Sequence, residues 1–374
     1  MARIPDQKIT QDLLRDYYEA RGRDLPWREN RDPYKVWVSE IMLQQTRVET
    51  VIPYFNTWIE RFPKLSDLAD ADEESILHLW QGLGYYSRAR NLLKAIQIVD
   101  EHMGGSVPRD PMKLRTLPGI GEYTANAIAS IAFGEPLAAI DGNLRRVLSR
   151  LFDLPDPSSA DLKSKATLLL DIERPGDWNQ AVMDLGATVC TPRTPDCGEC
   201  PLENQCQSAK KGTQVQRPIS KPKLRTRSVI QTVVIAVNSE GEFLLRKRPT
   251  EGLLAGLWEF PGTELTGNNV ETSPHEDVAK NLGIDLTGDK TELIPLNSLV
   301  DKLSHLTVTY QPLLVIGFDS ISHCVTPDRG YCWAGGDAVK NLPLPVGQQK
   351  LLKLAREALD AKNIQYRPSV SMSG

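Results

Sequence analysis

Four of the six cysteines of the chain lie in the segment Cys190-Thr191-Pro192-Arg193-Thr194-Pro195-Asp196-Cys197-Gly198-Glu199-Cys200-Pro201-Leu202-Glu203-Asn204-Gln205-Cys206. They are separated by six, two and five residues. Thiolates this close along a chain can converge on one metal centre. Zinc is the competing interpretation, but zinc sites usually use two short cysteine pairs, and this segment has one, Cys197 with Cys200. The spacing therefore favours a [4Fe–4S] cluster on Cys190, Cys197, Cys200 and Cys206.

The rest of the composition agrees with a metal centre built from reduced thiols. Residues 1–6 have no apolar signal core, so we expect a cytoplasmic chain, in which thiols stay reduced. No apolar run approaches the roughly 18 residues of a membrane span, so no membrane partner is expected. The net charge of −4 counts against a nucleic-acid binder. A local basic patch can nevertheless supply phosphate contacts, and basic residues gather between Lys210 and Arg227, where the alternative is a solvated linker.

The apolar pattern changes once along the 374 residues, a length typical of two or more domains. Up to residue 206, apolar residues recur at helical spacing. The next stretch is polar and basic and contains two prolines, which is typical of a linker. Runs rich in β-branched residues then predict strands at 229–237, 242–246, 306–310 and 313–316. We therefore predict a multidomain protein with an all-α domain (1–206, including the cysteine loop 190–206), a linker (207–228) and an α+β domain (229–374).

The turn Leu117-Pro118-Gly119-Ile120-Gly121 lies between two predicted helices, the second covering 122–133. Glycine permits backbone conformations and close approaches that other residues do not. Backbone N–H groups at such a turn, next to a helix N-terminus, can hold a phosphate. A plain interhelical turn is the alternative, because a single Gly-x-Gly is weak evidence.

Two carboxyl groups stand out by their surroundings. Glu40 is the one charged residue in the apolar and amide stretch 36–46, and poor solvation would raise its pKa enough to keep it protonated as a general acid. An exposed helical Glu is the ordinary alternative. Asp141 precedes a predicted helix, where Asp is a preferred N-cap and would stay fixed and ionised. An acid paired with an ionised carboxylate is what cleavage of a glycosidic bond requires.

Together these motifs resemble the helix–hairpin–helix DNA glycosylases of the endonuclease III superfamily, and within it most closely the MutY-type adenine DNA glycosylases. Five motifs agree in order and spacing, and the resemblance covers nearly the whole chain. They are Ser39–Thr46, Gly82–Asn91, Leu117–Ala125, Asp141–Asn143 and the four cysteines.

The resemblance implies a mechanism. The family flips adenine out of double-stranded DNA where it faces 8-oxoguanine or guanine. Glu40 would protonate N7 of adenine, and Asp141 would stabilise the cationic sugar, with Tyr123 and Asn143 holding these carboxyls. Bifunctional relatives carry a catalytic Lys at the position of Tyr123, which cannot form a Schiff base. We therefore predict a monofunctional, monomeric enzyme.

The resemblance also assigns binding residues. Those matching the family's adenine pocket are Arg23, Trp27, Leu43, Gln180 and Met183. Those matching neighbours of 8-oxoguanine or the DNA backbone are Gln45, Thr46, Leu83, Tyr85, Gly119 and Gly121, with Tyr85 wedged into the base stack. The cluster is expected to brace its loop, with Arg193 available for a phosphate.

The family's C-terminal domain has a Nudix hydrolase fold. The residues aligned with its metal-binding helix include Lys280 and Asn281 where carboxylates should hold Mg²⁺, so nucleotide hydrolysis is not expected. The domain is expected instead to recognise 8-oxoguanine. The family does so with a Phe-Ser-His loop, which here reads Leu303-Ser304-His305, without the aromatic residue. Three alternatives remain: a bifunctional pyrimidine glycosylase/lyase, a Nudix pyrophosphatase, and a non-enzymatic DNA-binding scaffold.

Overall fold

The structure, a computed structural model, describes residues 5–219, 226–265, 273–303, 305–318, 325–336 and 338–362. The chain divides into two compact units, which are described separately. The first comprises residues 1–71 and 88–222, and the second comprises residues 72–87 and 223–374. The short segment 72–87 contains helix α5 (Glu73–Leu79).

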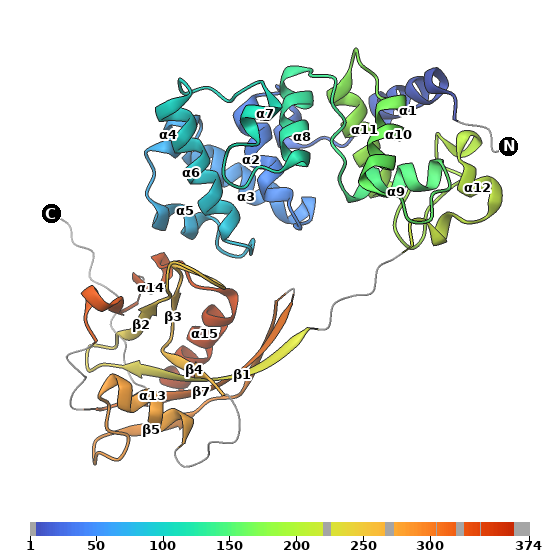
Figure 1. Cartoon of the computed structure of the whole chain (residues 1–374). Coiled ribbons are helices and arrows are strands. Elements are labelled where there is room, and N and C mark those ends of the chain that lie inside the picture. The colour runs from blue at the N-terminus through green and yellow to red at the C-terminus, as the bar shows by residue number, and fades with distance from the viewer. Residues whose placement is uncertain are drawn as a thin grey trace. The chain divides into compact units, whose positions relative to one another are not determined.

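The first unit is helical (Figure 1). Its helices are α1 (Gln7–Arg21), η1 (Pro26–Arg28), α2 (Pro33–Leu43), α3 (Val48–Arg61), α4 (Leu65–Ala69), α6 (Ser87–His102), α7 (Pro111–Leu114), α8 (Glu122–Phe133), α9 (Gly142–Leu151), α10 (Ser159–Leu169), α11 (Pro175–Thr188), η2 (Glu203–Gln205), α12 (Gln207–Lys211) and η3 (Gln214–Gln216). Several begin where an Asp or Ser side chain accepts hydrogen bonds from the first-turn N–H groups, as N-caps do.

Helix α11 is the centre of this unit. Its residues from Pro175 to Gly186 are all buried, and it packs against α1, α8 and α9. A helix that is buried all round must be surrounded by other elements. Helix α2 is nearly as buried and packs against α8. These contacts bring the middle of α2, the start of α8 and the start of α9 to one place.

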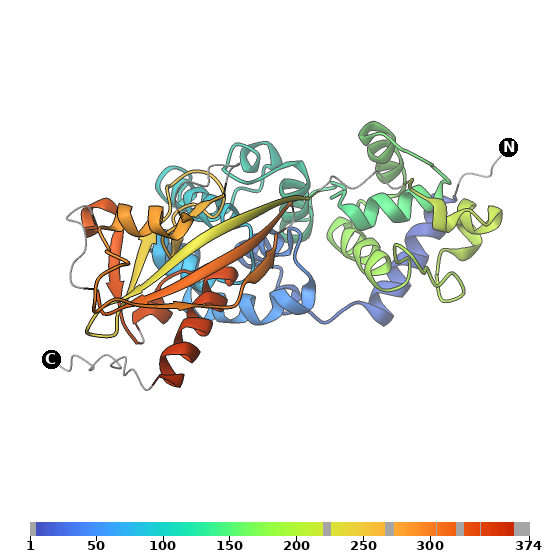
Figure 2. The same cartoon turned by 90° about the horizontal axis from the view of Figure 1, so that it is seen from below.

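The second unit contains a mixed sheet with strand order β3-β2-β1-β7-β5. Strand β4 also pairs with β1, β6 with β7, and β8 with β2. The strands are β1 (Arg227–Val237), β2 (Phe243–Lys247), β3 (Trp258–Glu259), β4 (Gly262–Glu264), β5 (Glu292–Pro295), β6 (Leu299–Lys302), β7 (Leu306–Ile316) and β8 (Tyr331–Ala334). Figure 2 shows the two long strands β1 and β7 running side by side, and their pairing is parallel over eleven residues.

Helices cover both faces of this sheet. Helix α15 (Val346–Ala361) packs on one face, where Leu351 and Ala355 join the core formed by Val233 and Ile235. Helix α13 (Pro274–Leu282) packs on the other, with Val278 against Val234. Val233 and Val234 reach opposite faces of the sheet because successive side chains of a strand point to opposite faces. A short helix, α14 (Ala338–Asn341), and a turn, η4 (Pro327–Arg329), complete the described elements.

Two expectations need correction. The strands predicted at 306–310 and 313–316 form one continuous strand, β7, in which Pro312 keeps its place in the register opposite Val233. The predicted linker 207–228 is folded over much of its length, because α12 and η3 occupy 207–216 and β1 begins at Arg227.

Asp153 anchors the first part of that stretch. Its carboxylate accepts bonds from Lys211 Nζ at 2.7 Å, Thr213 Oγ1 at 2.7 Å and Arg217 Nε at 2.8 Å. Burial would raise the pKa of Asp153, but these donors outweigh it and lower the pKa to about 2. Part of the basic stretch is therefore engaged in ion pairs within the first unit.

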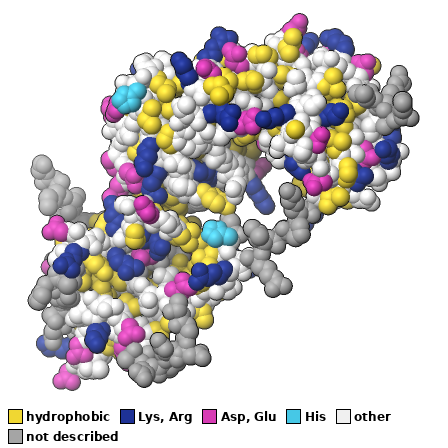
Figure 3. Space-filling view, viewed as in Figure 1, with side chains coloured by type: hydrophobic (Ala, Val, Ile, Leu, Met, Phe, Trp, Pro, Cys, Tyr) yellow, Lys and Arg dark blue, Asp and Glu magenta, His cyan; other side chains and the backbone are white. Residues whose placement is uncertain are grey.

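Across the described residues, no helix is long and apolar enough to cross a membrane. Basic and acidic side chains lie intermixed on the face shown in Figure 3, in keeping with the small net charge of −4.

Candidate active site

A cavity of about 480 Å³ opens in the helical unit where α2, α8, α9 and α11 meet. Its lining brings together predicted residues from distant parts of the chain. The predicted catalytic group there is Glu40, Tyr123, Asp141 and Asn143; the predicted adenine-pocket residues are Arg23, Trp27, Leu43, Gln180 and Met183; Gln45 and Thr46 also line it.

Glu40 lies in the third turn of α2 with 5% of its surface exposed. Burial raises the pKa of Glu40 to about 7, because the charged form loses its water. The Tyr123 hydroxyl donates a 2.6 Å hydrogen bond to Oε2 of Glu40 and partly offsets that shift. The negative charge of Asp141 adds to the upward shift. Near neutral pH, Glu40 can therefore carry a proton, which is the state of a general acid.

Asp141 is the N-cap of α9. Its Oδ1 accepts a 2.7 Å bond from the backbone N–H of Leu144, and its Oδ2 accepts a 2.8 Å bond from Nδ2 of Asn143. Burial nevertheless outweighs these donors and raises the pKa of Asp141 above its ordinary value. The sequence predicted a fixed, ionised N-cap; the upward direction of the pKa is an effect of burial that the sequence pattern did not indicate. The donors limit the shift, so the two carboxyls differ in their hydrogen-bonding surroundings.

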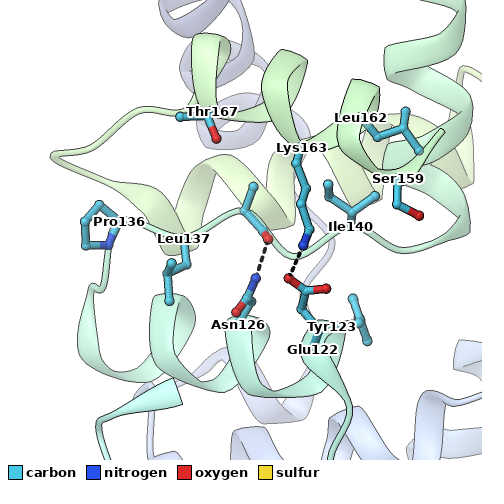
Figure 4. Close-up of a pocket in the computed structure, with 11 residues that line it drawn as sticks. Glu122, Tyr123, Asn126, Pro136, Leu137, Ile140, Ser159, Leu162, Lys163 and Thr167 are labelled. Carbon is cyan, nitrogen blue, oxygen red and sulfur yellow. Dashed lines mark hydrogen bonds and ion pairs between the residues drawn. The ribbon is translucent and has the colours of Figure 1, made fainter. Parts of the chain in front are cut away.

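The segment before Asp141 is held on both sides. Nδ2 of Asn126 donates to the Ala138 carbonyl at 2.9 Å, and Oδ1 of Asn179 accepts from the Ala139 N–H at 2.8 Å. Asn126 lines a separate cavity of about 300 Å³ that Tyr123 also borders (Figure 4). The Figure shows Asn126 aimed at this segment beside the ion pair of Lys163 and Glu122, whose Nζ and Oε1 lie 2.6 Å apart. These contacts fix the path of the chain into Asp141.

One pairing at the cavity was not foreseen from sequence. Asp184, fully buried in α11, accepts two bonds from Arg28, at 2.7 and 2.9 Å, and one from Nε of Arg23 at 2.7 Å. Burial would raise the pKa of Asp184, but the two guanidinium groups lower it below its ordinary value. The pair fixes Arg28 in the cavity wall, where its charge also lowers the pKa of Glu40. No sequence signal links Arg28 with a partner 156 residues away.

Asn143 connects the carboxyl pair to the cysteine loop. Its Oδ1 accepts a 2.8 Å bond from Nη2 of Arg146, which also donates to the Gly186 carbonyl at 2.6 Å. Nε of Arg146 donates to the Cys190 carbonyl at 2.8 Å. The backbone of Gly186 approaches so closely that a Cβ there would lie 2.7 Å from Cβ of Asn143. Asp141 and the first cysteine are thus joined by a continuous chain of hydrogen bonds.

Two of the four cysteines of this loop contact Arg150 of α9. Nη1 of Arg150 lies 3.2 Å from Cys190 Sγ, and Cys206 Sγ lies 3.3 Å from the Arg150 carbonyl oxygen. Burial, together with the charges of the neighbouring sulfurs, raises the pKa of Cys200 to about 12. The pKa values of Cys197 and Cys206 are raised as well, mainly by burial. Buried thiols with raised pKa values fit a cationic iron centre, which takes them up as thiolates and compensates their charge. Among the described residues, no group of three His, Cys, Asp or Glu is placed to ligate a single metal ion.

Three family profiles match the chain. They are the "HhH-GPD superfamily base excision DNA repair protein" over residues 38–170, the "Iron-sulfur binding domain of endonuclease III" over 190–206, and the "NUDIX domain" over 232–354. An adenine DNA glycosylase of Rattus norvegicus is 35% identical over 92% of this chain and 77% of its own length. One from Buchnera aphidicola (subsp. Schizaphis graminum) is 32% identical over 91% of this chain and 97% of its own. This chain belongs to the adenine DNA glycosylases.

Two further likenesses cover the chain less completely. A human adenine DNA glycosylase is 38% identical over 80% of this chain, which spans 65% of that protein. The structure of a thermostable thymine-DNA glycosylase matches 55% of this chain and 97% of its own, with TM-score 0.52 and 28% identity. The predicted fold class, a helix–hairpin–helix glycosylase domain with a Nudix-like α+β domain, is confirmed. The enzyme class, hydrolysis of N-glycosidic bonds in DNA, is likewise confirmed.

The iron–sulfur cluster predicted for this adenine DNA glycosylase is confirmed, since the matched domain covers Cys190 through Cys206. The sulfurs of the four cysteines would hold the cluster. Its iron supplies Lewis-acid and redox chemistry when bound. The hydrogen bonds of Arg146 and Arg150 tie the backbone of the loop to α9. The start of the cysteine loop is therefore anchored to the helix that Asp141 caps.

The remaining predicted site residues lie outside the cavity. Gly119 has φ +77°, and a Cβ there would lie 2.8 Å from Cβ of Asn91, so its glycine character is required. Gly121, the N-cap of α8, has an extended backbone and open space beside it. Leu83 is buried, and Tyr85 has φ +48° with 38% exposure; both lie in segment 72–87 of the second unit.

The predicted lesion-reading loop is described in part. The His305 carbonyl accepts a 3.1 Å bond from the Arg227 N–H, and the Leu303 N–H donates to the Leu306 carbonyl at 2.7 Å. Ser304 lies outside the described residues. On α13, the aligned Glu276 forms a capping box with Ser273, so this carboxylate serves the helix terminus.

Proposed function

We propose that this chain excises adenine that faces 8-oxoguanine or guanine in double-stranded DNA, as a monofunctional glycosylase. One observation carries the proposal: two different carboxyl groups line one cavity. Glu40 is buried and has a pKa of about 7, and Asp141 is the hydrogen-bonded N-cap of α9. A glycosidic bond breaks readily when the leaving base is protonated and the cationic sugar is stabilised. Glu40 and Asp141 can divide these two tasks.

The proposed sequence of events begins with the proton of Glu40. Glu40 transfers it to N7 of adenine, and the bond from the base to the sugar then breaks with both electrons leaving on the base. Asp141 stabilises the cation that develops on the sugar. The ionised Glu40 then accepts a proton from water as the water attacks the sugar, which leaves an abasic site. Tyr123 and Asn143 hold the two carboxyls throughout.

The flipped base would lie among the predicted adenine-pocket residues. Trp27 and Met183 supply apolar surface, and Gln180 and Arg23 supply polar groups. The phosphates would meet the N–H groups at Gly121, where open space adjoins a helix N-terminus. On the opposite strand we place Gln45, Thr46 and Leu83 near the lesion and Tyr85 in the base stack, with Arg193 reaching a phosphate.

The second unit is proposed to read 8-oxoguanine through Ser304 and His305 rather than to hydrolyse nucleotides. Because one chain supplies both the cavity and the lesion-reading loop, a monomer suffices. Replacing His305 by Ala in the full chain should reduce the preference for 8-oxoguanine over guanine while adenine release continues. An unchanged preference would contradict the role of this loop.

The absence of a lyase step follows from Tyr123. The phenol of Tyr123, which is hydrogen-bonded to Glu40, cannot form an imine with the sugar, whereas a lysine amine can. We expect borohydride to trap no stoichiometric enzyme–DNA adduct. A trapped, turnover-competent imine would exclude the monofunctional assignment.

A single-turnover assay on three duplexes tests the whole proposal. The duplexes contain adenine opposite 8-oxoguanine, adenine opposite guanine, and an oxidised pyrimidine. Adenine release from the first two supports the proposal. Strand cleavage at the pyrimidine would favour a glycosylase/lyase, and no base release would favour a DNA-binding scaffold. The control is Glu40→Gln, which should bind the mismatch without excision.

A further inference from the structure

A second cavity adjoins the candidate adenine pocket. It has a volume of about 230 Å³ and is lined by residues of α1, η1, α8 and α11. Four residues line both cavities: Trp27, Arg28, Ile131 and Gln180. These four side chains therefore form the partition between them. The outer walls of the second cavity are Tyr18, Glu19, Arg31, Arg174 and Asp177.

A cavity next to the adenine pocket matters because of the order in which the parts of a flipped nucleotide enter the pocket. An extruded nucleotide enters its pocket base first, so its sugar and phosphates fill the entrance behind it. When the glycosidic bond breaks, the base is the deepest part of the substrate. The abasic strand still closes the front entrance at that moment. The free base can leave either after the DNA dissociates or through an opening at the far end.

The charges of the second cavity suit a neutral ligand. All three guanidinium groups that line it are paired. Arg28 holds Asp184 at 2.7 Å, and Arg31 Nη2 lies 2.6 Å from Oδ1 of Asp177. Arg174 contacts Asp177 at 2.8 Å and Glu19 at 2.5 Å. Because these positive charges are compensated, the cavity has little attraction for a phosphate.

Its shape and polar groups suit a purine. A cavity of about 150 Å³ accommodates benzene, so 230 Å³ has room for a larger planar ring. The Tyr18 ring, with the Arg28 guanidinium 5.6 Å from its centroid, offers a surface on which a ring can stack. The Gln180 amide and the Asp177 carboxylate can accept bonds from an exocyclic amine.

We propose that this cavity, the exit chamber, receives the excised adenine and lets it leave while the abasic DNA still fills the front entrance. The inference rests on the proposed function. The base passes the partition by displacement of the Gln180 or Trp27 side chain, while Arg28 stays paired with Asp184. It then leaves past the ion pair of Arg31 and Asp177, which joins the loop before α2 to the first turn of α11.

The test follows three time courses in one single-turnover reaction, using full-length enzyme and a duplex with radiolabelled adenine opposite 8-oxoguanine. Alkali reveals abasic sites, rapid filtration separates free adenine from enzyme–DNA complexes, and competitor DNA reports dissociation. In the unmodified enzyme, free adenine should appear before the DNA dissociates. Adenine that stays in the complex until dissociation would overturn the proposal.

Variants at the rim sharpen the test. Glu19→Trp places a large ring at the rim of the chamber and should slow the appearance of free adenine by about tenfold, with abasic-site formation unchanged. Adding Arg31→Asn, which removes the ion pair and tolerates the φ of +52° at this position, should restore release. Glu19→Gln controls for the lost charge, and Asp16→Trp controls for a large ring elsewhere on α1; both should behave as the unmodified enzyme.

The outcomes separate this inference from the proposed function. If Glu19→Trp slows abasic-site formation itself, the cavity serves the chemical step and not the departure of the base, and the inference is wrong. Adenine release that is equally fast in Glu19→Trp and in both controls also contradicts it. If abasic sites form normally and only the release predictions fail, the proposed function stands. If no abasic site forms, both are refuted.

Discussion

The hydroxyl of Tyr123 donates a 2.6 Å hydrogen bond to Oε2 of Glu40, although 83 residues separate the two in the chain. The bond joins α8 to α2 inside the cavity that Asp141 also lines. It opposes the effect of burial on Glu40, so the acid is tuned by two competing contributions. Proton affinity, position and reactivity at this site therefore depend on the packing of two helices.

The rate of excision should fall as the pH rises through about 7. The reactive form of Glu40 is the protonated one, and its pKa in the folded protein is about 7. The single-turnover rate of abasic-site formation, measured between pH 5.5 and 9 at constant ionic strength, should therefore be higher on the acidic side. A rate that is constant from pH 6 to 9 would contradict the assignment of Glu40 as the acid.

Replacing Tyr123 by Phe should move this pH dependence upward. The variant loses the donor that lowers the pKa of Glu40, so the acid should stay protonated to a pH higher by about one unit. The rate at neutral pH should fall as well, because Glu40 loses its orienting partner. If the excision rate fell at the same pH as in the unmodified enzyme, the hydrogen bond would not tune the pKa of Glu40.

Glu40→Gln should stabilise the fold at neutral and alkaline pH. The folded state raises the pKa of Glu40 from 4.5 to about 7, so it binds the proton more tightly than the unfolded chain does. That contribution favours folding below about pH 4.5 and is lost as the pH rises through 7, which costs up to about 3 kcal/mol. Urea unfolding of the helical unit should show a gain for Glu40→Gln that is larger at pH 8 than at pH 5. A gain that does not depend on pH would contradict the assigned cause.

Two substitutions at Asp141 should separate its structural role from its chemical one. Asn caps a helix about as well as Asp, whereas Ala loses the cap at a cost of about 0.5–2 kcal/mol. We expect Asp141→Asn to unfold at the same temperature as the unmodified enzyme but to lose excision. Asp141→Ala should unfold at a lower temperature and also lose excision. Excision retained in Asp141→Asn would show that the negative charge is not needed.

Arg146→Met should lower both excision and cluster content. The variant loses bonds to Asn143, to the Gly186 carbonyl and to the Cys190 carbonyl, so the support of Asp141 and the backbone of the cysteine loop loosen together. Iron content, visible absorbance and single-turnover rate measure the two effects. The matched control is Arg145→Met, because Arg145 contacts Asp156 instead, at 3.3 Å. Equal effects of the two variants would exclude a specific role for Arg146.

Residue types and their spacing along the chain were enough to predict the chemical groups of the candidate site. The cysteine spacing indicated the cluster, the isolated charge of Glu40 indicated an acid, and Asp141 before a helix indicated a fixed carboxylate. The change of apolar period separated a helical region from an α+β region. Such inferences are possible because residue type and local spacing are properties of short segments.

How those groups interact depends on the tertiary structure. The pKa of Glu40 depends on burial by helices far along the chain, and Arg28 meets Asp184 across 156 residues. Likewise, Asp153 holds the basic stretch that looked like a linker, and parallel pairing with β1 carries β7 through Pro312 as one strand. Burial and pairing arise from contacts between distant segments, so local pattern cannot specify them.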